Sequence, residues 1–226
     1  MSAVFLFWRP TVTMMLKDAG LLLGAYLLGS VPFAYIVAKR VQGIDIRTVG
    51  SGNVGATNVA RVLGRKWGIF VFLLDVLKGF LPVAAAQWLN GRGVGSADPP
   101  LIVALTGLAA IAGHNWSVYL GFRGGKGMAT SCGAFLAIFP LGLLIALAVW
   151  AIFAAATRYV SIASMAAAVA ILVAAVALQH DPFAKGKYLS GIAALAAILA
   201  IVRHRSNICR LIQGSEHKIG EKKPAE

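Results

Sequence analysis

A polar, glycine-rich segment over residues 50–61, with the sequence GSGNVGATNVAR, stands in a chain that is otherwise strongly apolar. Its three glycines allow the backbone to turn tightly and to approach a ligand closely. Successive backbone N–H groups in such a loop form an anion-binding concavity, and an arginine adds a planar fork that suits phosphate or carboxylate. The candidate ligand residues of this first motif are Gly50, Ser51, Gly52, Asn53, Thr57, Asn58 and Arg61.

A second motif of the same character, GHNWSVYLGFRGGKGMAT, occupies residues 113–130. Its GGKG run is not a Walker A motif, because the GxxxxGK[ST] spacing is missing and a glycine follows the lysine. At the start of a helix, GGKG still fits phosphate binding through backbone N–H groups and the helix dipole. Its candidate residues are His114, Gly124, Gly125, Lys126, Gly127 and Thr130. Two such cationic motifs in one apolar chain indicate a site for phosphate esters.

The composition is typical of an integral membrane protein. The chain has 226 residues, of which 59% are hydrophobic, and its mean hydropathy is +0.79, values too apolar for an ordinary soluble domain. The formal net charge is +13, but the basic residues lie between apolar segments and in the tail. This pattern favours a cytoplasmic membrane surface and anionic substrates over nucleic acid. The cysteine and histidine spacings predict no disulfide and no metal site, and we expect no cofactor.

The apolar runs predict an all-α integral membrane protein of about seven transmembrane helices. Pro32 predicts a kink in the first span, and Pro140 divides the run 131–156 into two arms of about a dozen residues, where a full span needs about 20. The first predicted span covers residues 19–37. The others cover residues 67–89, residues 101–119, a segment that ends near residue 178, and residues 188–202. We expect an N-terminal extension (1–18), a single transmembrane catalytic domain (19–204) and a basic cytoplasmic tail (205–226).

The positions of the basic residues decide the number of crossings. Both motifs and the tail are basic, which places all three on the cytoplasmic side. A split at Pro140 gives an even number of crossings after the second motif and returns the tail to that side, whereas one unsplit helix does not. The prediction is therefore seven helices with the N-terminus outside and the C-terminus cytoplasmic. It also places Arg158, Ser161 and Ser164 beside both motifs as binding residues.

Four segments in order resemble the signature of the bacterial acyl-phosphate–glycerol-3-phosphate acyltransferases: GSGNVGATNVAR, GHNWSVYLGFRGGKGMAT, TRYVSIAS and HRSNICRLIQGSE. The resemblance implies a multi-pass enzyme of the bacterial cytoplasmic (inner) membrane whose active site faces the cytoplasm. Such an enzyme moves a fatty acyl group from acyl phosphate to the 1-hydroxyl of glycerol 3-phosphate. The products are lysophosphatidic acid and phosphate, in the first acylation step of phospholipid synthesis. Functional coupling to the enzyme that forms acyl phosphate is a further expectation.

The resemblance also assigns roles to individual residues. It implies that Ser51 and Arg61 face a substrate phosphate and that His204 and Asn207, one turn apart at the last helix end, belong to the catalytic site. An interfacial helix cap is the alternative for the latter pair. His114 has no carboxylate at the spacing of the His–Asp dyad used by other glycerolipid acyltransferases, so a binding or structural role is favoured over that of a general base.

Two charged residues interrupt the second predicted span. Asp75 and Lys78 lie three positions apart on one helical face, and we expect them to form an intramembrane ion pair. Charged residues within a span are as a rule either functional or paired, and a structural, orienting role is favoured here.

The sequence predicts direct attack rather than a covalent enzyme intermediate. It contains no convincing Ser-His-Asp arrangement and no cysteine placed as a nucleophile. Acyl phosphate is an activated mixed anhydride, so positioning and charge stabilisation suffice. Lys126 and Arg61 are predicted to hold the phosphate groups, with His204 or the acyl phosphate's own oxygen as proton acceptor. A membrane transporter or channel for phosphate esters is the alternative function, disfavoured because no inverted repeat is visible.

Overall fold

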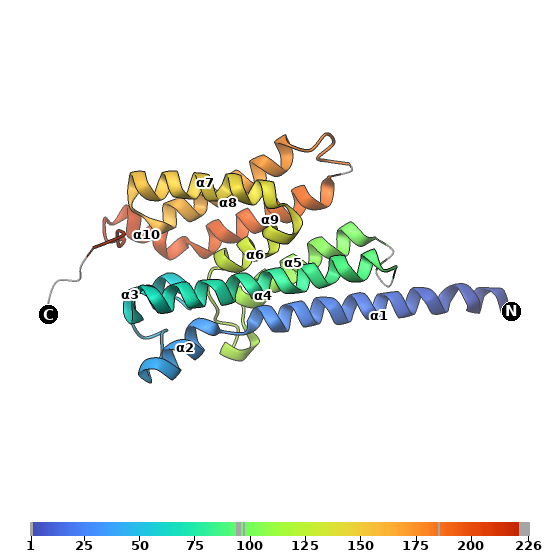
Figure 1. Cartoon of the computed structure of the whole chain (residues 1–226), viewed down its shortest axis with the longest axis horizontal. Coiled ribbons are helices and arrows are strands. Elements are labelled where there is room, and N and C mark those ends of the chain that lie inside the picture. Colours follow the sequence, from blue (N-terminus) through green and yellow to red (C-terminus); the bar gives the residue numbers. More distant parts are fainter. Residues whose placement is uncertain (1, 94–95, 97, 185, 222–226) are drawn as a thin grey trace. The chain divides into compact units, whose positions relative to one another are not determined.

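A computed structural model describes residues 2–93, 96, 98–184 and 186–221 of the chain. All regular secondary structure in these ranges is helical, as the sequence predicts (Figure 1). The chain divides into two compact units, Met1–Ile138 and Phe139–Glu226. Both motifs lie in the first unit, and the TRYVSIAS and HRSNICRLIQGSE segments lie in the second.

The first unit is built around three long helices. In Figure 1, α1 (Ser2–Ser30), α4 (Arg65–Gly91) and α5 (Pro99–Asn115) lie side by side, and each packs on the other two. The short helix α3 (Ala56–Leu63) packs on α4, and so does α6 (Met128–Ile138). The remaining elements of this unit are α2 (Phe33–Gln42) and the 3-10 turn η1 (Val118–Leu120). The two motifs therefore connect helices that belong to one packed bundle.

Glycines allow the long helices of the first unit to approach backbone to backbone. A Cβ atom on Gly29 of α1 would collide with the carbonyl oxygen of Ala110 on α5, and one on Gly113 would collide with that of Tyr26. Small residues at helix contacts are typical of membrane bundles, where close van der Waals packing drives association. Helices α4 and α6 approach each other in the same way: a Cβ on Gly79 would collide with the carbonyl oxygen of Thr130, and one on Gly133 with that of Val76.

Both predicted proline breaks are present. Helix α1 ends at Ser30, and α2 begins directly after Pro32. Helix α6 ends one residue before Phe139, whose backbone is extended (φ −147°, ψ 70°), and Pro140 is the first residue of α7 (Pro140–Thr157). Proline disfavours the helical conformation of the residue before it and fits the first helical position, where its missing N–H is not needed.

The lengths of the helices bear on the number of membrane crossings. Among the described residues, five helical segments are long and apolar enough to cross a membrane, and a sixth arises if α9 (Lys187–Arg203) and α10 (Arg205–Ile212) count as one span bent by 51°. Helix α6 is apolar but has only 11 residues. Helix α7 has 18 residues and is longer than the predicted arm. The prediction of seven crossings therefore depends on the short helix α6.

The second half of the first motif is a helix, where the sequence analysis predicts a continuous loop. Helix α3 begins at Ala56, directly after Gly55, so Thr57, Asn58 and Arg61 are helical. Thr57 and Arg61, four residues apart, share the exposed face of α3, whereas Asn58 is buried. The three glycines of the first half suggest a loop, but the segment from Ala56 to Leu63 contains no residue that breaks a helix.

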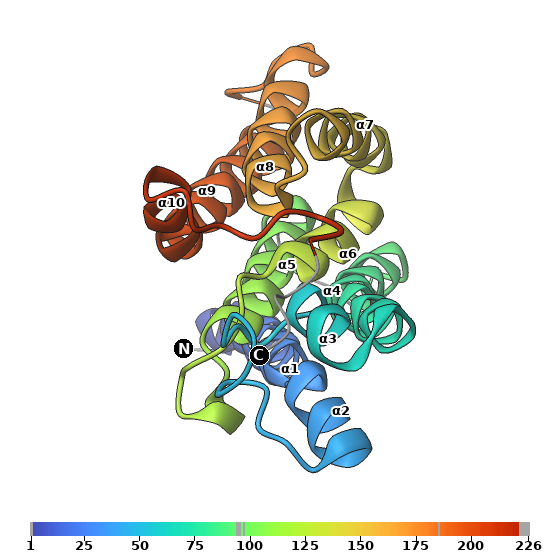
Figure 2. The same cartoon turned by 90° about the vertical axis from the view of Figure 1, so that its left-hand side faces the viewer.

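In the described part of the second unit, four helices follow one another, and the first three pack in sequence order. Helix α8 (Val160–Ala177) packs against α7 and against α9, and α10 follows α9. The segment after α10 returns to the junction of α7 and α8 (Figure 2), where the N–H of Ile219 donates to the carbonyl of Arg158 at 2.7 Å. Arg158 has a left-handed backbone (φ 63°) that ends α7. The C-terminal segment is thereby fastened to this junction.

Candidate active site

Asn58 organises the first motif from inside the bundle. Its side-chain oxygen accepts the N–H of Ser51 at 2.8 Å, and its amide nitrogen donates to the carbonyls of Ile46 and Val49, both at 3.1 Å. Gly50 is left-handed (φ 62°), and a Cβ there would collide with the Asn58 side chain. The structure therefore explains Asn58 and Gly50 as residues that shape the loop, and their predicted contact with a ligand stays a prediction.

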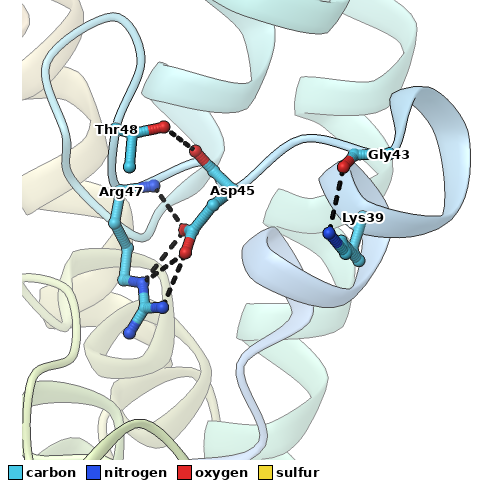
Figure 3. A network of polar contacts seen from close by, with 5 residues as sticks. All are labelled: Lys39, Gly43, Asp45, Arg47 and Thr48. Carbon is cyan, nitrogen blue, oxygen red and sulfur yellow. Dashed lines mark hydrogen bonds and ion pairs between the residues drawn. The ribbon is translucent and has the colours of Figure 1, made fainter.

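An exposed ion pair shapes the loop that leads into the first motif (Figure 3). The guanidinium of Arg47 contacts the Asp45 carboxylate through Nη2 at 2.6 Å and through Nε at 2.9 Å. Thr48 donates to the Asp45 carbonyl, and Lys39 donates to the carbonyl of Gly43. The hydrogen bonds from Arg47 lower the pKa of Asp45 to about 2. The carboxylate thus stays charged throughout the physiological range and keeps the turn closed.

The second motif folds back on the end of α5 and touches the first motif. The N–H of Gly124 donates to the Asn115 carbonyl at 3.2 Å, and that of Gly125 donates to the His114 carbonyl at 3.0 Å. These bonds satisfy carbonyls that the helix end leaves without helical partners. A Cβ on Gly125 would collide with the carbonyl oxygen of Val54 and with His114 Nε2. The two glycine-rich motifs therefore meet at Gly125.

Lys126 and its neighbours lead into a helix, as predicted for GGKG. Helix α6 begins at Met128, and Gly127 before it is left-handed (φ 77°). Lys126 is half-buried. Thr130 is fully buried where α6 packs on α4, and its hydroxyl has no hydrogen-bond partner among the described residues. This position favours a packing role for Thr130, whereas Lys126 lies where the two motifs meet.

A buried charged cluster lies behind the meeting point of the motifs. Lys78 Nζ is 2.8 Å from Asp75 Oδ1, which confirms the predicted ion pair, and His114 Nδ1 is 3.7 Å from the same oxygen. Lys78 also donates to the carbonyl of Val31, at the break between α1 and α2. A cavity of about 10 Å³, room for one water molecule, is lined by all three ionisable residues and by Gly125. His114 thus has a carboxylate partner that its sequence neighbourhood does not reveal.

In the second unit, one carboxylate gathers the predicted polar residues. Glu216 Oε1 accepts from Ser161 Oγ at 2.8 Å and from Asn207 Nδ2 at 2.5 Å, while Oε2 accepts from Arg210 Nε at 2.7 Å. Burial alone would raise the pKa of Glu216, but the hydrogen bonds from Asn207, Arg210 and Ser161 outweigh it and lower that pKa. Glu216 therefore fixes the orientation of two candidate site residues.

The remaining candidate residues of the second unit have defined partners. His204 is 3% exposed, and its Nδ1 lies 2.7 Å from the Ala200 carbonyl. A carbonyl oxygen can only accept, so Nδ1 carries the proton and Nε2 is the basic nitrogen of the neutral ring. Ser164 accepts a hydrogen bond from Trp150 at 3.4 Å. The exposed guanidinium of Arg158 donates to a carbonyl of the C-terminal segment, which favours a structural role for it.

The structure groups the predicted residues into two sets, one within each unit. The first unit holds all candidates of both motifs, and the second holds Arg158, Ser161, Ser164, His204 and Asn207. Sequence reasoning missed Glu216, although it is the single carboxylate of the HRSNICRLIQGSE segment. It also missed Asn115, which is fully buried and whose side chain lies next to Gly127.

The family model described as glycerol-3-phosphate acyltransferase matches residues 19–214. A glycerol-3-phosphate acyltransferase of Shouchella clausii (strain KSM-K16) is 48% identical over 200 residues, which cover 87% of this chain and 93% of that protein. One of Geobacter sulfurreducens (strain ATCC 51573 / DSM 12127 / PCA) is 45% identical over 204 residues, which cover 90% and 98% of the two chains.

Two crystal structures have the same fold. The glycerol 3-phosphate form of PlsY (YgiH), an integral membrane glycerol 3-phosphate acyltransferase, is 40% identical with a TM-score of 0.80, and the match covers 90% of this chain and 96% of that one. The lysophosphatidic acid form of PlsY is 39% identical with a TM-score of 0.74 and the same coverage. The all-helical bundle, its two glycine-rich motifs and these similarities together show that the chain belongs to the glycerol-3-phosphate acyltransferase family of integral membrane enzymes.

Proposed function

We propose that the protein transfers a fatty acyl group from acyl phosphate to the 1-hydroxyl of glycerol 3-phosphate. The observation that carries this proposal is the contact of the two glycine-rich motifs at Gly125, with Lys126 as the next residue. Both substrates are phosphate esters or anhydrides, and Arg61 and Lys126 supply cations suited to them. Relatives crystallised in glycerol 3-phosphate and lysophosphatidic acid forms support the proposed acceptor and product.

In the proposed reaction the acceptor oxygen attacks the acyl carbonyl carbon directly. A new ester C–O bond forms, the C–O bond to phosphate breaks, and phosphate leaves with the bonding electrons. Lys126 neutralises the charge that grows on the leaving phosphate, and Arg61 holds a phosphate group in a bidentate manner. Because the anhydride is already activated, binding and orientation of the two substrates provide most of the acceleration.

The hydroxyl proton of glycerol 3-phosphate needs an acceptor. His204 Nε2 suits this role because the contact of Nδ1 with the Ala200 carbonyl fixes the tautomer. The leaving phosphate oxygen is the second acceptor that the chemistry allows. Ser161 and Asn207, oriented by Glu216, are proposed as further substrate-binding residues.

The proposed setting is the bacterial cytoplasmic membrane, with the reaction on its cytoplasmic side. The acyl chain would lie among the apolar helices, and the basic surface would attract both anionic substrates. Acyl phosphate is a reactive anhydride, so its use fits functional coupling to the enzyme that forms it.

Purified protein in detergent tests the proposal, because transport has no meaning there. Palmitoyl phosphate with glycerol 3-phosphate should give lysophosphatidic acid and phosphate in equal amounts, and palmitoyl-CoA should give neither. An Arg61→Ala/Lys126→Ala double variant, purified in the same way, reports any contaminating enzyme. Comparable rates with palmitoyl-CoA would contradict the proposed donor, and no turnover with either donor would contradict the proposed function.

A further inference from the structure

Three ionisable side chains meet inside the helix bundle of the first unit. The exposed fractions are 1% for Asp75, 2% for Lys78 and 7% for His114. Asp75 Oδ1 lies between the other two, 2.8 Å from Lys78 Nζ and 3.7 Å from His114 Nδ1. Charges at such depth are costly unless they are paired, so their presence calls for a purpose beyond packing.

His114 connects this cluster to the second motif through two contacts. Its carbonyl accepts the N–H of Gly125 at 3.0 Å, and its ring nitrogen Nε2 faces Gly125 so closely that a Cβ there would collide with it. The opposite ring nitrogen, Nδ1, faces Asp75. A carboxylate beside one nitrogen of an imidazole favours, through its charge, one orientation of the ring, and so influences the position of whatever the other nitrogen contacts.

We infer that Asp75 is a positioning residue: through the His114 ring it holds the Gly124–Gly125 backbone in the geometry that binds a substrate phosphate. This inference rests on the proposed function. Lys78 balances the charge of Asp75 and fastens the cluster to the Val31 carbonyl at the break between α1 and α2. The cluster thus supports a phosphate-binding backbone from behind and touches no substrate itself.

Asp75→Asn tests the inference, because it keeps the size of the side chain and removes its charge. A displaced loop binds phosphate more weakly in both ground and transition states, so we expect KM for acyl phosphate to rise by about tenfold. KM for glycerol 3-phosphate should stay within about twofold. An unchanged KM for both substrates together with a lower apparent kcat would overturn the inference. A smaller fraction of folded protein produces that combination without any change at the binding site.

A double-mutant cycle tests the path through the imidazole. If Asp75 acts through His114, then Asp75→Asn/His114→Gln should have the same KM for acyl phosphate as His114→Gln alone, within about twofold. Multiplication of the two single effects would show that Asp75 acts independently of His114, and would overturn the inference.

A charge-balanced variant separates positioning from folding. Asp75→Asn/Lys78→Met contains no unpaired ammonium group, so its thermal midpoint should be higher than that of Asp75→Asn. Its KM for acyl phosphate should stay raised, because the Asp75–His114 contact is still absent. Recovery of KM together with the midpoint would overturn the inference, since the ion pair would then serve folding alone. Wild-type turnover, measured first with both substrates, tests the proposed function separately from these variants.

Discussion

The side-chain oxygen of Asn58, on α3, accepts a hydrogen bond from the main-chain N–H of Ser51 at 2.8 Å, across the whole turn of the first motif. The amide nitrogen of the same side chain donates to the Ile46 and Val49 carbonyls. Aspartate has nearly the same shape but no donor, and its charge would oppose both the carbonyls and an incoming phosphate. We therefore expect Asn58→Asp to lower kcat/KM by about tenfold or more, measured as phosphate release.

The matched control is Asn90→Asp at the end of α4. Asn90 also donates to a carbonyl, that of Ala86, and accepts a main-chain N–H, that of Ser96, but it lies outside both motifs. Its variant should keep kcat/KM within about twofold of wild type. Equal losses in the two variants would contradict the specific role of Asn58.

Glu216 makes stability depend on acid pH. Its pKa is lowered in the folded protein, so its stabilising contribution is complete above the ordinary value of 4.5 and is lost as pH falls through the lowered pKa. At neutral pH, Glu216→Gln should lower Tm by roughly 3 °C or more in detergent. Below pH 4.5, the Tm of the wild type should fall more steeply with decreasing pH than the Tm of this variant.

Glu221→Gln is the control for this prediction. Glu221 lies in the same C-terminal segment but is exposed, and its carboxylate accepts the N–H of Lys218. We expect a Tm close to that of wild type. If the Tm values of Glu216→Gln and of the wild type fall in parallel with decreasing pH, the Glu216 carboxylate does not hold Ser161 and Asn207 as described.

The sequence predicted the parts of the site that depend on local chemistry. Pro140 and Pro32 predicted helix breaks because proline restricts its own backbone and that of the residue before it. The glycines predicted close backbone approach, and Gly125 shows it most clearly, against Val54 and His114.

Long-range relationships were not predictable from the sequence. Asp75 is 39 positions before His114, and nothing local indicates that α4 and α5 bring the two together. Similarly, Glu216 reaches Ser161 only because the C-terminal segment folds back on the α7–α8 junction. Helix α3 was missed because a helix as short as eight residues leaves little periodicity to detect.

Cysteine labelling in intact cells tests the seven-helix topology. The native Cys209 on α10 is exposed and should react only from the cytoplasmic side. Phe183, 78% exposed in the segment between α8 and α9, should react from outside as Phe183→Cys in a Cys209→Ser background. Ser161 is a poor reporter because it is buried and bonded to Glu216. Labelling of positions 183 and 209 from the same side would contradict the model.

Arg61 and Lys126 should differ in their kinetic effects. Arg61→Lys keeps the charge but loses the bidentate fork, so KM for one phosphate substrate should rise by about tenfold with kcat nearly unchanged. Lys126→Ala removes a group that acts on the leaving phosphate, so kcat should fall by about 100-fold or more. If Lys126→Ala keeps a near-normal kcat while only KM rises, Lys126 binds substrate and does not stabilise the leaving group.

Rapid-quench measurement of phosphate release in the first turnover is the most direct test of the proposed direct transfer. Enzyme mixed with excess palmitoyl phosphate alone should release no burst of phosphate, because no acyl-enzyme forms. Addition of glycerol 3-phosphate should start release of phosphate and formation of lysophosphatidic acid together, at the same rate. A burst of phosphate equal to the enzyme concentration in the absence of glycerol 3-phosphate would show a covalent intermediate and contradict direct attack.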